Sequence, residues 1–531
     1  MRNAGFIWLF ALAALLGACG TGNPPPPLTA RDTSITASNA YTRLSLDSSD
    51  LAAFLAAGGL PGATDTAIRN FYSARNYQYA WFNEEGLTEQ AQAFQSLLEQ
   101  RKDLTGDSAL YGAGLGETLD TLLNGDSLPA SPQTIKSTEL RLTAGFFRYL
   151  DAAFGGRADP ADLQWYIPVR KLAPVAMLDS FLQRKPGSWR PLGAFYDRLQ
   201  QKLITYAAIV RRGGWDSIKT PARKLSKGDT GMAVIQLRRR LAITGHYHGD
   251  SSAVFDAALQ RAVREVQPAF GLAPTGIATR DLIDELNTPA EQRIGQMMVN
   301  LERLRWMPDI SRKTRIIVNI PEYRLHVLTP DSQALDMRIV VGKAAHRTVI
   351  FSDELQYIVF SPYWNVPPSI VRHEILPAMK KDGSYLRRND MEITGNSGGL
   401  PVIRQRPGAQ NALGRVKFLF PNRYNIYLHD TPAKSLFGRD KRAFSHGCIR
   451  LQHPFELAQY LLRDDSSWTG ARIRKAMHGS RETWVKLRKP VPVFIVYLTC
   501  WVDAGGQLQF RDDIYGHDAS MESHLFRADA R

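Results

Sequence analysis

The sequence predicts a multidomain α+β protein in which two helical regions precede a mostly β region. Three observations support this fold class. The chain has 531 residues, which is long for a single domain. Apolar residues recur at helical spacing in the N-terminal part, for example at Leu87, Ala91, Phe94 and Leu98. After about residue 312 the pattern changes to short runs rich in β-branched residues, with Gly, Pro and Asp at their ends.

Residues 1–18 have the features of an export signal. A basic residue precedes the apolar run from Phe6 to Leu16, which is too short to cross a bilayer because a span takes about 20 residues. The Leu-Gly-Ala-Cys ending at Cys19 resembles a bacterial lipoprotein box, which implies cleavage before Cys19 and acylation of its sulfur. The residue after Cys19 is Gly20, whereas an inner-membrane retention signal typically has Asp at this position. This difference favours the outer membrane. The alternative is an ordinary signal or signal anchor with an incidental Cys.

The remaining chain divides into four segments after a tether. Residues 19–39 are rich in Pro, Ser, Thr and Gly, which predicts a disordered tether. Residues 40–222 predict a helical domain without a catalytic constellation, and residues 224–288 a small three-helix domain with glycine-marked turns. A helical connector, 289–311, leads to the mostly β domain, 312–531. Within that domain, residues 372–414 are basic and loop-rich, as expected of a capping insertion that acts as a lid.

Charge and cysteine content restrict the possible partners. Lys plus Arg exceed Asp plus Glu by 66 to 51, so the net charge is +15. This charge fits either a solvated basic surface or affinity for an anionic polymer or lipid surface. Export, and the lack of a basic block with interleaved aromatics, argue against nucleic acid. Only Cys19, Cys448 and Cys500 occur. Cys500 lies in a β-branched and aromatic run and is predicted to be a buried strand residue.

The stretch "LHDTPAKSLFGRDKRAFSHGCIRL", residues 428–451, contains the most informative polar cluster. Its His429, His446 and Cys448 could bind a metal, fill a core or activate a sulfur nucleophile. Three ligands without a paired Cys or His spacing are a poor structural zinc site, which needs four. Ser445 and Gly447 beside them are poor core residues. The nucleophile is therefore the favoured interpretation.

A thiol nucleophile needs a base and a group that holds the oxyanion. A free Cys has a pKa of about 8.5, and a neighbouring imidazolium can lower it. His429, at the end of the strand-like run "YNIYLHD", is the candidate base for Cys448. The backbone amides of Gly447 and Cys448 are candidate oxyanion donors. His446 assists this step or orients the site, and spacing alone does not rank the two histidines.

His429, fifteen residues, and then Ser445-His446-Gly447-Cys448 resemble the catalytic motif of L,D-transpeptidases with the YkuD-type fold. The resemblance implies that His429 is the base and that Cys448 is the acylated nucleophile. "WNVPPSI" and "PNRYNIYLHDTPAKSLF" are similar to the YcbB-type branch, which combines a helical scaffold domain, a peptidoglycan-binding domain and a capping insertion. "GDTG" and "FGLAPTG" within 224–288 resemble the small three-helix peptidoglycan-binding domain. One departure is Thr348-Val349, where many relatives carry Thr-Pro.

The resemblance implies acyl transfer between peptidoglycan stem peptides. Cys448 would attack the diaminopimelate carbonyl of a tetrapeptide donor, and the side-chain amine of an acceptor stem would resolve the thioester to a 3→3 cross-link. Arg450 is expected to pair with a substrate carboxylate or to form a structural salt bridge. Tyr427, which faces the same side as His429 on its strand, shapes the pocket. Trp364 either does so too or belongs to an aromatic core.

Neither the residues nor the resemblance call for a cofactor or a metal. The implied location is the periplasm of a Gram-negative bacterium, with a lipid anchor in the outer membrane and acylation by carbapenems. One rival interpretation is an L,D-carboxypeptidase or endopeptidase in which water resolves the same thioester. A second is a non-catalytic, lipid-anchored wall-binding protein. Attachment of an outer-membrane lipoprotein to the wall is a further variant of the family.

Overall fold

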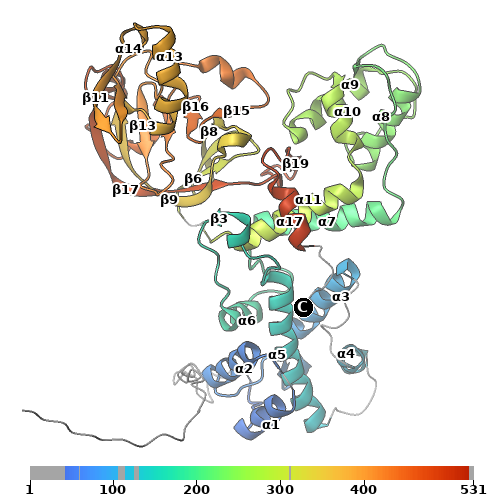
Figure 1. Cartoon of the computed structure of the whole chain (residues 1–531). Coiled ribbons are helices and arrows are strands. Elements are labelled where there is room, and N and C mark those ends of the chain that lie inside the picture. Colours follow the sequence, from blue (N-terminus) through green and yellow to red (C-terminus); the bar gives the residue numbers. More distant parts are fainter. Residues whose placement is uncertain (1–41, 59, 106–113, 125–130, 310–312, 526–531) are drawn as a thin grey trace, which may run out of the picture. The chain divides into compact units, whose positions relative to one another are not determined.

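The computed structural model describes residues 42–58, 60–105, 114–124, 131–309 and 313–525. The predicted signal peptide and the whole predicted tether, Cys19 included, lie outside them. The chain divides into two compact units, shown with the whole chain in Figure 1. The first unit comprises residues before 101, 107–149 and 174–187, and the second comprises 101–106, 150–173 and 188–531. No helix among the described residues is both long and apolar enough to cross a membrane.

The first unit is helical, as the apolar spacing predicts. It contains α1 (Ser48–Gly58), α2 (Gly62–Ala74), most of α3 (Glu89–Thr105), α4 (Leu115–Asn124), the first part of α5 (Pro132–Phe154), α6 (Pro174–Leu182) and a hairpin of β1 (Phe82–Asn83) and β2 (Gly86–Leu87). Its core is aromatic. The rings of Trp81, Phe94, Phe146 and Phe181 lie with centroids 5.1 to 6.4 Å apart. Beside these rings, buried Glu139 accepts the Tyr72 hydroxyl at 2.8 Å and the Ala80 N–H at 2.7 Å.

The second unit begins with helices that support the β domain. Strand β3 (Trp165–Tyr166) follows the short helix η2 (Ala161–Leu163) and pairs in parallel with β9 (Ile350–Phe360). Helix α7 (Ala194–Arg211) packs against the long connector helix α11 (Ala290–Trp306). The predicted helical range 40–222 therefore contributes to both units.

A small three-helix domain lies between α7 and α11 in the sequence. Its elements are β4 (Lys224–Leu225), α8 (Met232–Ile243), α9 (Ala257–Val266), η3 (Gln267–Phe270), β5 (Ala278–Thr279) and α10 (Arg280–Asn287). Asp256 caps α9 by accepting the Leu259 N–H at 2.8 Å, which satisfies one of the free amides of the first turn. The apolar faces of α8 and α9 meet in one buried core that includes Val234, Leu237 and Phe255.

The C-terminal domain is built on a closed barrel. Its strands are β6 (Arg315–Asn319), β7 (Arg324–Leu328), β8 (Gln333–Gly342), β9, β13 (Val416–Leu419), β14 (Leu428–His429), β16 (Ile449–Leu451) and β17 (Thr483–Val496). They pair in the order β13-β14-β16-β8-β7-β6-β17-β9, and β9 pairs again with β13. Because the barrel closes, these strands have few free edges. Two further strands pair with the barrel strands: β15 (Ala443–Ser445) with β8, and β3 with β9.

Elements after the central strands complete this domain. Helices α15 (Pro454–Leu461) and α16 (Gly470–Met477) contribute to its main core, and α17 (His517–Leu525) ends the described chain. Strands β18 (Cys500–Val502) and β19 (Leu508–Phe510) form a hairpin. Cys500 is fully buried in β18, which confirms the prediction of a buried strand residue.

The predicted insertion, residues 372–414, is more ordered than its composition suggests. It contains most of η5 (Val371–Ile375), together with α13 (Leu376–Lys381), α14 (Tyr385–Arg388), β11 (Met391–Ser397) and β12 (Leu400–Gln405). The ordered region starts before residue 372, because β10 (Trp364–Asn365) pairs with β12 and α12 (Pro368–Ile370) leads into η5. Val366, Val371, Ile375 and Ile403 form its own buried cluster. The prediction of a loop-rich insertion is therefore wrong, because short helices and strands with charged outer faces lack a long apolar period.

Candidate active site

Parallel pairing places the predicted histidine on the strand beside the one that follows the predicted cysteine. In the β14–β16 pair, Leu428 lies opposite Ile449 and His429 opposite Arg450. The Ile449 N–H donates to the Tyr427 carbonyl at 3.1 Å, which fixes Tyr427 beside Cys448. Side chains alternate along a strand, so Tyr427 and His429 share a face, and their ring centroids are 5.8 Å apart.

The thiol of Cys448 lies between a backbone carbonyl and Tyr427. Its Sγ donates to the Asn425 carbonyl at 3.6 Å, and Asn425 is in the left-handed region with φ of 55°. Burial raises the pKa of the Cys448 thiol, whereas hydrogen bonds from Tyr427 and the charge of Arg450 lower it less. The resting thiol is therefore protonated at neutral pH.

His429 is held as a neutral imidazole. Its side chain is buried, and its Nδ1 lies 2.5 Å from the Asp430 carbonyl oxygen. A carbonyl only accepts, so Nδ1 carries the proton and Nε2 keeps a free lone pair. Burial, followed by the charge of Arg450, lowers the pKa of His429 to about 3. The expected imidazolium that lowers the cysteine pKa is thus not the resting state, because burial disfavours both charges.

The loop before Cys448 is fixed by glycine geometry and side-chain hydroxyls. Gly447 has φ of 114°, a conformation that L side chains rarely adopt. Thr348 Oγ1 donates to the Gly447 carbonyl at 2.8 Å, and Ser445 Oγ donates to the Cys448 carbonyl at 2.6 Å. The Gly447 N–H donates to Ser445 Oγ at 3.1 Å. In this arrangement the Gly447 amide is already engaged, which leaves the Cys448 amide as the other predicted oxyanion donor.

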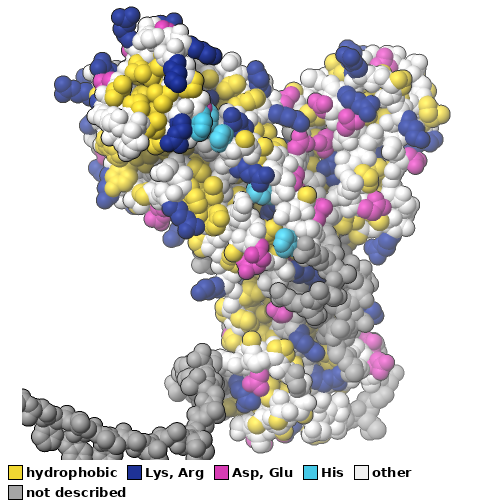
Figure 2. Space-filling view, in the orientation of Figure 1, with side chains coloured by type: hydrophobic (Ala, Val, Ile, Leu, Met, Phe, Trp, Pro, Cys, Tyr) yellow, Lys and Arg dark blue, Asp and Glu magenta, His cyan; other side chains and the backbone are white. Residues whose placement is uncertain are grey.

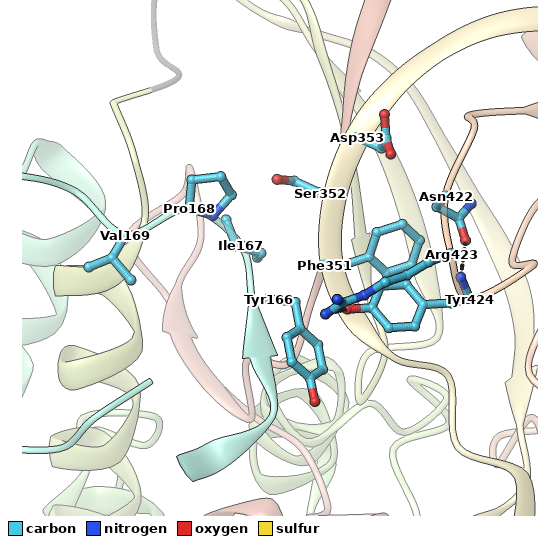
Figure 3. A pocket seen from close by; sticks show the side chains of 10 residues that line it. All are labelled: Tyr166, Ile167, Pro168, Val169, Phe351, Ser352, Asp353, Asn422, Arg423 and Tyr424. Carbon is cyan, nitrogen blue, oxygen red and sulfur yellow. Dashed lines mark hydrogen bonds between the residues drawn. The ribbon is translucent and has the colours of Figure 1, made fainter. Parts of the chain in front are cut away.

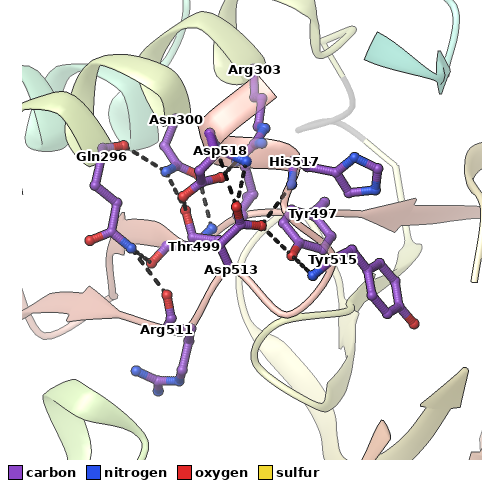
Figure 4. Close-up of polar contacts among 12 residues, drawn as sticks. Gln296, Asn300, Arg303, Tyr497, Thr499, Arg511, Asp513, Tyr515, His517 and Asp518 are labelled. Atoms are coloured by element: carbon purple, nitrogen blue, oxygen red, sulfur yellow. Dashed lines mark hydrogen bonds and ion pairs between the residues drawn. The ribbon is translucent and has the colours of Figure 1, made fainter. Parts of the chain in front are cut away.

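A buried polar network holds Gly342 and Thr348, the residues that contact this loop. Tyr515 donates its hydroxyl to the Gly342 carbonyl at 2.5 Å and accepts the Thr348 N–H at 3.3 Å. The Tyr515 N–H in turn donates to the Tyr497 hydroxyl, which donates to Asp513 at 2.6 Å. Figure 4 shows Tyr497, Asp513 and Tyr515 close to a second group, Asn300, Arg303, Thr499 and Asp518. The hydrogen bonds of this second group tie α17 and the chain before it to α11.

His446 points toward the capping insertion. Its Nε2 lies 2.9 Å from Oε1 of Glu374 in η5, and its ring centroid is 5.0 Å from that of His346. Sequence reasoning missed Glu374, because no local pattern connects a residue of the insertion with the Ser-His-Gly-Cys motif. Asn425 was also missed, although Asn is a residue type that tolerates the left-handed region.

The two remaining predicted residues differ in their surroundings. Arg450 lies near Cys448 and His429, and its buried Nε has no hydrogen-bond partner among the described residues. Trp364 packs against the apolar cluster of the insertion, which favours the core role. Within the described ranges, no three His, Cys, Asp or Glu side chains are grouped so that they could hold a metal ion.

Comparison with known proteins identifies the domain that carries this site. Residues 313–493 match the YkuD family, the L,D-transpeptidase catalytic domain. The chain carries an L,D-transpeptidase catalytic domain. Residues 66–209 also match a family described as a scaffold domain. Residues 230–286 match a family provisionally described as a peptidoglycan binding domain.

A curated protein of Haemophilus influenzae, provisionally named an L,D-transpeptidase, is 33% identical over 250 residues. The alignment covers 44% of this chain and 50% of the relative, so the chain spans about half the length of that relative. Two solved L,D-transpeptidases, from Xylanimonas cellulosilytica and Mycobacterium smegmatis, are 14% and 12% identical, with TM-scores of 0.18 and 0.20. They cover 52% and 35% of this chain, and 100% and 58% of their own. At these scores the fold rests on the family match and the strand order.

Proposed function

We propose that this chain is a peptidoglycan L,D-transpeptidase that forms 3→3 cross-links through a thioester on Cys448. The proposal depends chiefly on His429, whose Nδ1 is held by the Asp430 carbonyl so that Nε2 is unprotonated. His429 lies on β14, which pairs with β16, and β16 begins directly after Cys448. A thiol next to a neutral, oriented imidazole is a nucleophile with its base.

The first half-reaction is acylation. The Cys448 side chain rotates from the Asn425 carbonyl toward His429, and its proton passes to Nε2 as the sulfur attacks the diaminopimelate carbonyl of the donor. The Cys448 N–H stabilises the resulting oxyanion. When the C–N bond to the terminal D-Ala breaks, His429 returns the proton to the leaving amine and a thioester remains.

The second half-reaction regenerates the thiol. The side-chain amine of an acceptor stem attacks the thioester carbonyl and gives its proton to His429. Collapse of the tetrahedral intermediate breaks the C–S bond, and the proton returns to sulfur. In this proposal the Asp430 carbonyl, which accepts from His429 Nδ1, orients Nε2 toward these atoms. The Asp430 carboxylate is held in turn by the Arg415 N–H at 2.8 Å and by Lys434 at 2.5 Å.

Other groups of the site would bind and orient the substrate. Arg450 offers an unpaired Nε to a substrate carboxylate, and Tyr427 packs beside the thiol. Glu374 holds His446 from the insertion, so that the insertion covers one side of the loop. A covered thioester favours an amine over water, and this contact favours transpeptidation over the L,D-carboxypeptidase or endopeptidase alternative.

Location and anchoring form a second part of the proposal. The domain match to peptidoglycan-binding proteins fits action outside the cytoplasm, in the periplasm. Acylation of Cys19 would anchor the protein in the outer membrane. The alternative of a non-catalytic wall anchor uses the same lipid and residues 224–288 but gives no role to the His429 and Cys448 arrangement.

Product analysis tests the proposal. The soluble chain, from about residue 35, is incubated with purified tetrapeptide muropeptides, and the products are read by mass spectrometry. Dimers that lack one D-Ala support transpeptidation, and the Cys448→Ala variant should give none. Tripeptide monomers without dimers would make the chain a carboxypeptidase. Binding to sacculi without any product would leave only the wall-anchor interpretation.

A further inference from the structure

Trp484 is a large aromatic side chain that the proposed mechanism does not use. It lies near the start of β17, and 56% of it is exposed, more than any other aromatic side chain in the described ranges. One exposed apolar residue is ordinary in a soluble protein. This indole is unusual because its neighbours hold it in one orientation and because it lies on the same face of the barrel as His429.

Glu482 fixes the indole ring. Its Oε2 accepts the Nε1–H of Trp484 at 3.1 Å, and its Oε1 accepts the Tyr363 N–H at 2.7 Å. The Lys417 ammonium lies 3.3 Å from the same Oε1 and 5.5 Å from the centre of the indole ring. The Tyr357 ring meets the indole edge-on, with 6.0 Å between the ring centroids. A ring held by these contacts loses little conformational freedom when it binds a ligand.

Strand register places Trp484 and His429 in one row. Lys417 lies opposite His429 in the β13–β14 pair and opposite Val359 in the β13–β9 pair. Val359 in turn lies opposite Trp484 in the β9–β17 pair. Residues directly opposite each other in neighbouring strands point to the same face of a sheet. Because neighbouring strands are about 4.8 Å apart, the row runs for about 14 Å along the sheet from the His429 backbone to the Trp484 backbone.

This distance fits the length of a donor stem peptide. The terminal D-Ala of a tetrapeptide follows diaminopimelate, so diaminopimelate is the third residue from the sugar. Three extended residues span about 10 Å, and the sugar begins just beyond them. With the donor carbonyl beside His429, the first sugar ring reaches the Trp484 end of the row. An acceptor reacts through the end of a side chain, which adds to this length, so the match favours the donor.

The groups around the indole suit a sugar. The C–H face of a pyranose is apolar and packs on the face of an aromatic ring, which carries partial negative charge. The Glu482 carboxylate accepts hydrogen bonds and the Lys417 ammonium donates them, as the hydroxyl and amide groups at a sugar's edge require. Among the described residues, β9, β13 and β17 have no other exposed large apolar side chain. The apolar surface is therefore small for a protein interface.

A separate cavity of about 530 Å³ lies where β3 pairs with β9, and Figure 3 shows its walls. They include Tyr166, which is 42% exposed, and Phe351 and Asp353 of β9. Asp353 precedes Val359 by six residues of β9, which corresponds to about 20 Å along the strand. The cavity is therefore not part of the row, and Tyr166 is a useful comparison for Trp484.

We propose that Trp484 is a stacking platform for the sugar that carries the donor's stem peptide, with Glu482 and Lys417 at the sugar's edge. The inference rests on the proposed function, because it takes the donor carbonyl to lie beside His429 and Cys448. It makes the preferred donor of the catalytic domain a glycan-linked stem and not a free peptide.

Calorimetry with two ligands tests the platform without the reaction. The ligands are a disaccharide tetrapeptide and the same tetrapeptide without sugar, and the protein is the full chain with Cys448→Ala. Adding Trp484→Ala should weaken binding of the disaccharide tetrapeptide about fivefold to tenfold, the loss expected for one aromatic stacking contact, and that of the free tetrapeptide less than about twofold. Trp484→Phe should keep most of the affinity. Phe195→Ala removes an aromatic of α7 that is 47% exposed beside Arg198 and should change neither.

Kinetics of acylation without an acceptor assign the platform to the donor. Trp484→Ala should raise KM for the disaccharide donor with little change in kcat. Equal losses for both ligands, no loss for either, or a loss with Tyr166→Ala in place of Trp484→Ala would overturn the proposal. So would an effect that appears only when the acceptor is varied. Sugar-dependent binding through Trp484 in a chain that forms no product would refute the proposed function and leave the platform standing.

Discussion

At Cys448 and His429, the resting site holds a neutral thiol and a neutral imidazole. Because the pKa of His429 is lowered to about 3, its basic form is present at all pH values above that. The pKa of Cys448 is raised, so its thiol form persists through neutral pH. We therefore expect kcat/KM to be flat between about pH 5 and pH 8. A rise centred near pH 6.5 in a pH profile would contradict this account.

Variants of the two histidines provide the control for the pH profile. His429→Ala should lower kcat/KM at neutral pH by about 100-fold or more, with recovery at alkaline pH as the thiol ionises without a base. His446→Ala should recover less with pH, because hydroxide does not replace a group that positions the loop. The opposite pattern would exchange the roles of the two residues.

Glu374 is a positioning residue for His446. Glu374→Gln should lower kcat/KM several-fold, because the 2.9 Å contact between Glu374 and His446 loses the carboxylate charge. The insertion would then hold the loop before Cys448 less firmly. Steady-state kinetics should show a larger change in kcat than in KM. The matched control is Glu456→Gln, which weakens an exposed pair with His453 at 3.7 Å and should leave both constants unchanged. Similar effects of the two variants would remove Glu374 from the site.

At the scale of elements, the capping insertion depends on its own small core. Ile403→Ala should destabilise it by about 2–4 kcal/mol, the usual cost of truncating a fully buried isoleucine. Hydrogen exchange should accelerate in residues 364–405 and not in the barrel strands. If the insertion excludes water from the thioester, the same variant should give more tripeptide and fewer dimers. Unchanged product ratios with faster exchange would contradict the lid.

The elements that the sequence predicted are those with a clear period or a strong motif. The helices of the first unit, the three-helix core and barrel strands such as β6, β9 and β17 follow from apolar spacing. The composition of residues 372–414 predicts loops, because the short helices and strands there are charged on their outer faces and lack a long apolar period. Glu374 and Asn425 could not be predicted, since their roles arise from contacts distant in sequence. The protonation states of Cys448 and His429 depend on burial, which a motif does not encode.

At the scale of the whole molecule, the net charge is +15, yet the chain has many acidic as well as basic side chains. Figure 2 shows Lys and Arg side chains scattered over the face in view, with acidic side chains between them. This distribution fits a solvated basic surface better than a single track for a polyanion. Binding to sacculi is therefore expected to depend mainly on the small three-helix domain.

Anchoring is a property of the whole chain that is separable from catalysis. Cys19→Ser should move the protein from the membrane fraction to the soluble fraction or leave its signal uncleaved. A chain that starts at about residue 35 should be as active as the anchored form, because Cys19 lies in the predicted tether. Fractionation and activity assays of the two forms check this. Lower activity of the soluble chain would contradict an anchor that serves location alone.

The central claim is that Cys448 carries the acyl group. The most direct test is mass spectrometry of the chain quenched during turnover with a tetrapeptide donor, followed by peptide mapping of the adduct. The account predicts a thioester on Cys448 that contains the donor without its terminal D-Ala, and the same site of acylation by a carbapenem. An adduct on another residue, or cross-linked product formed by Cys448→Ala, would contradict it.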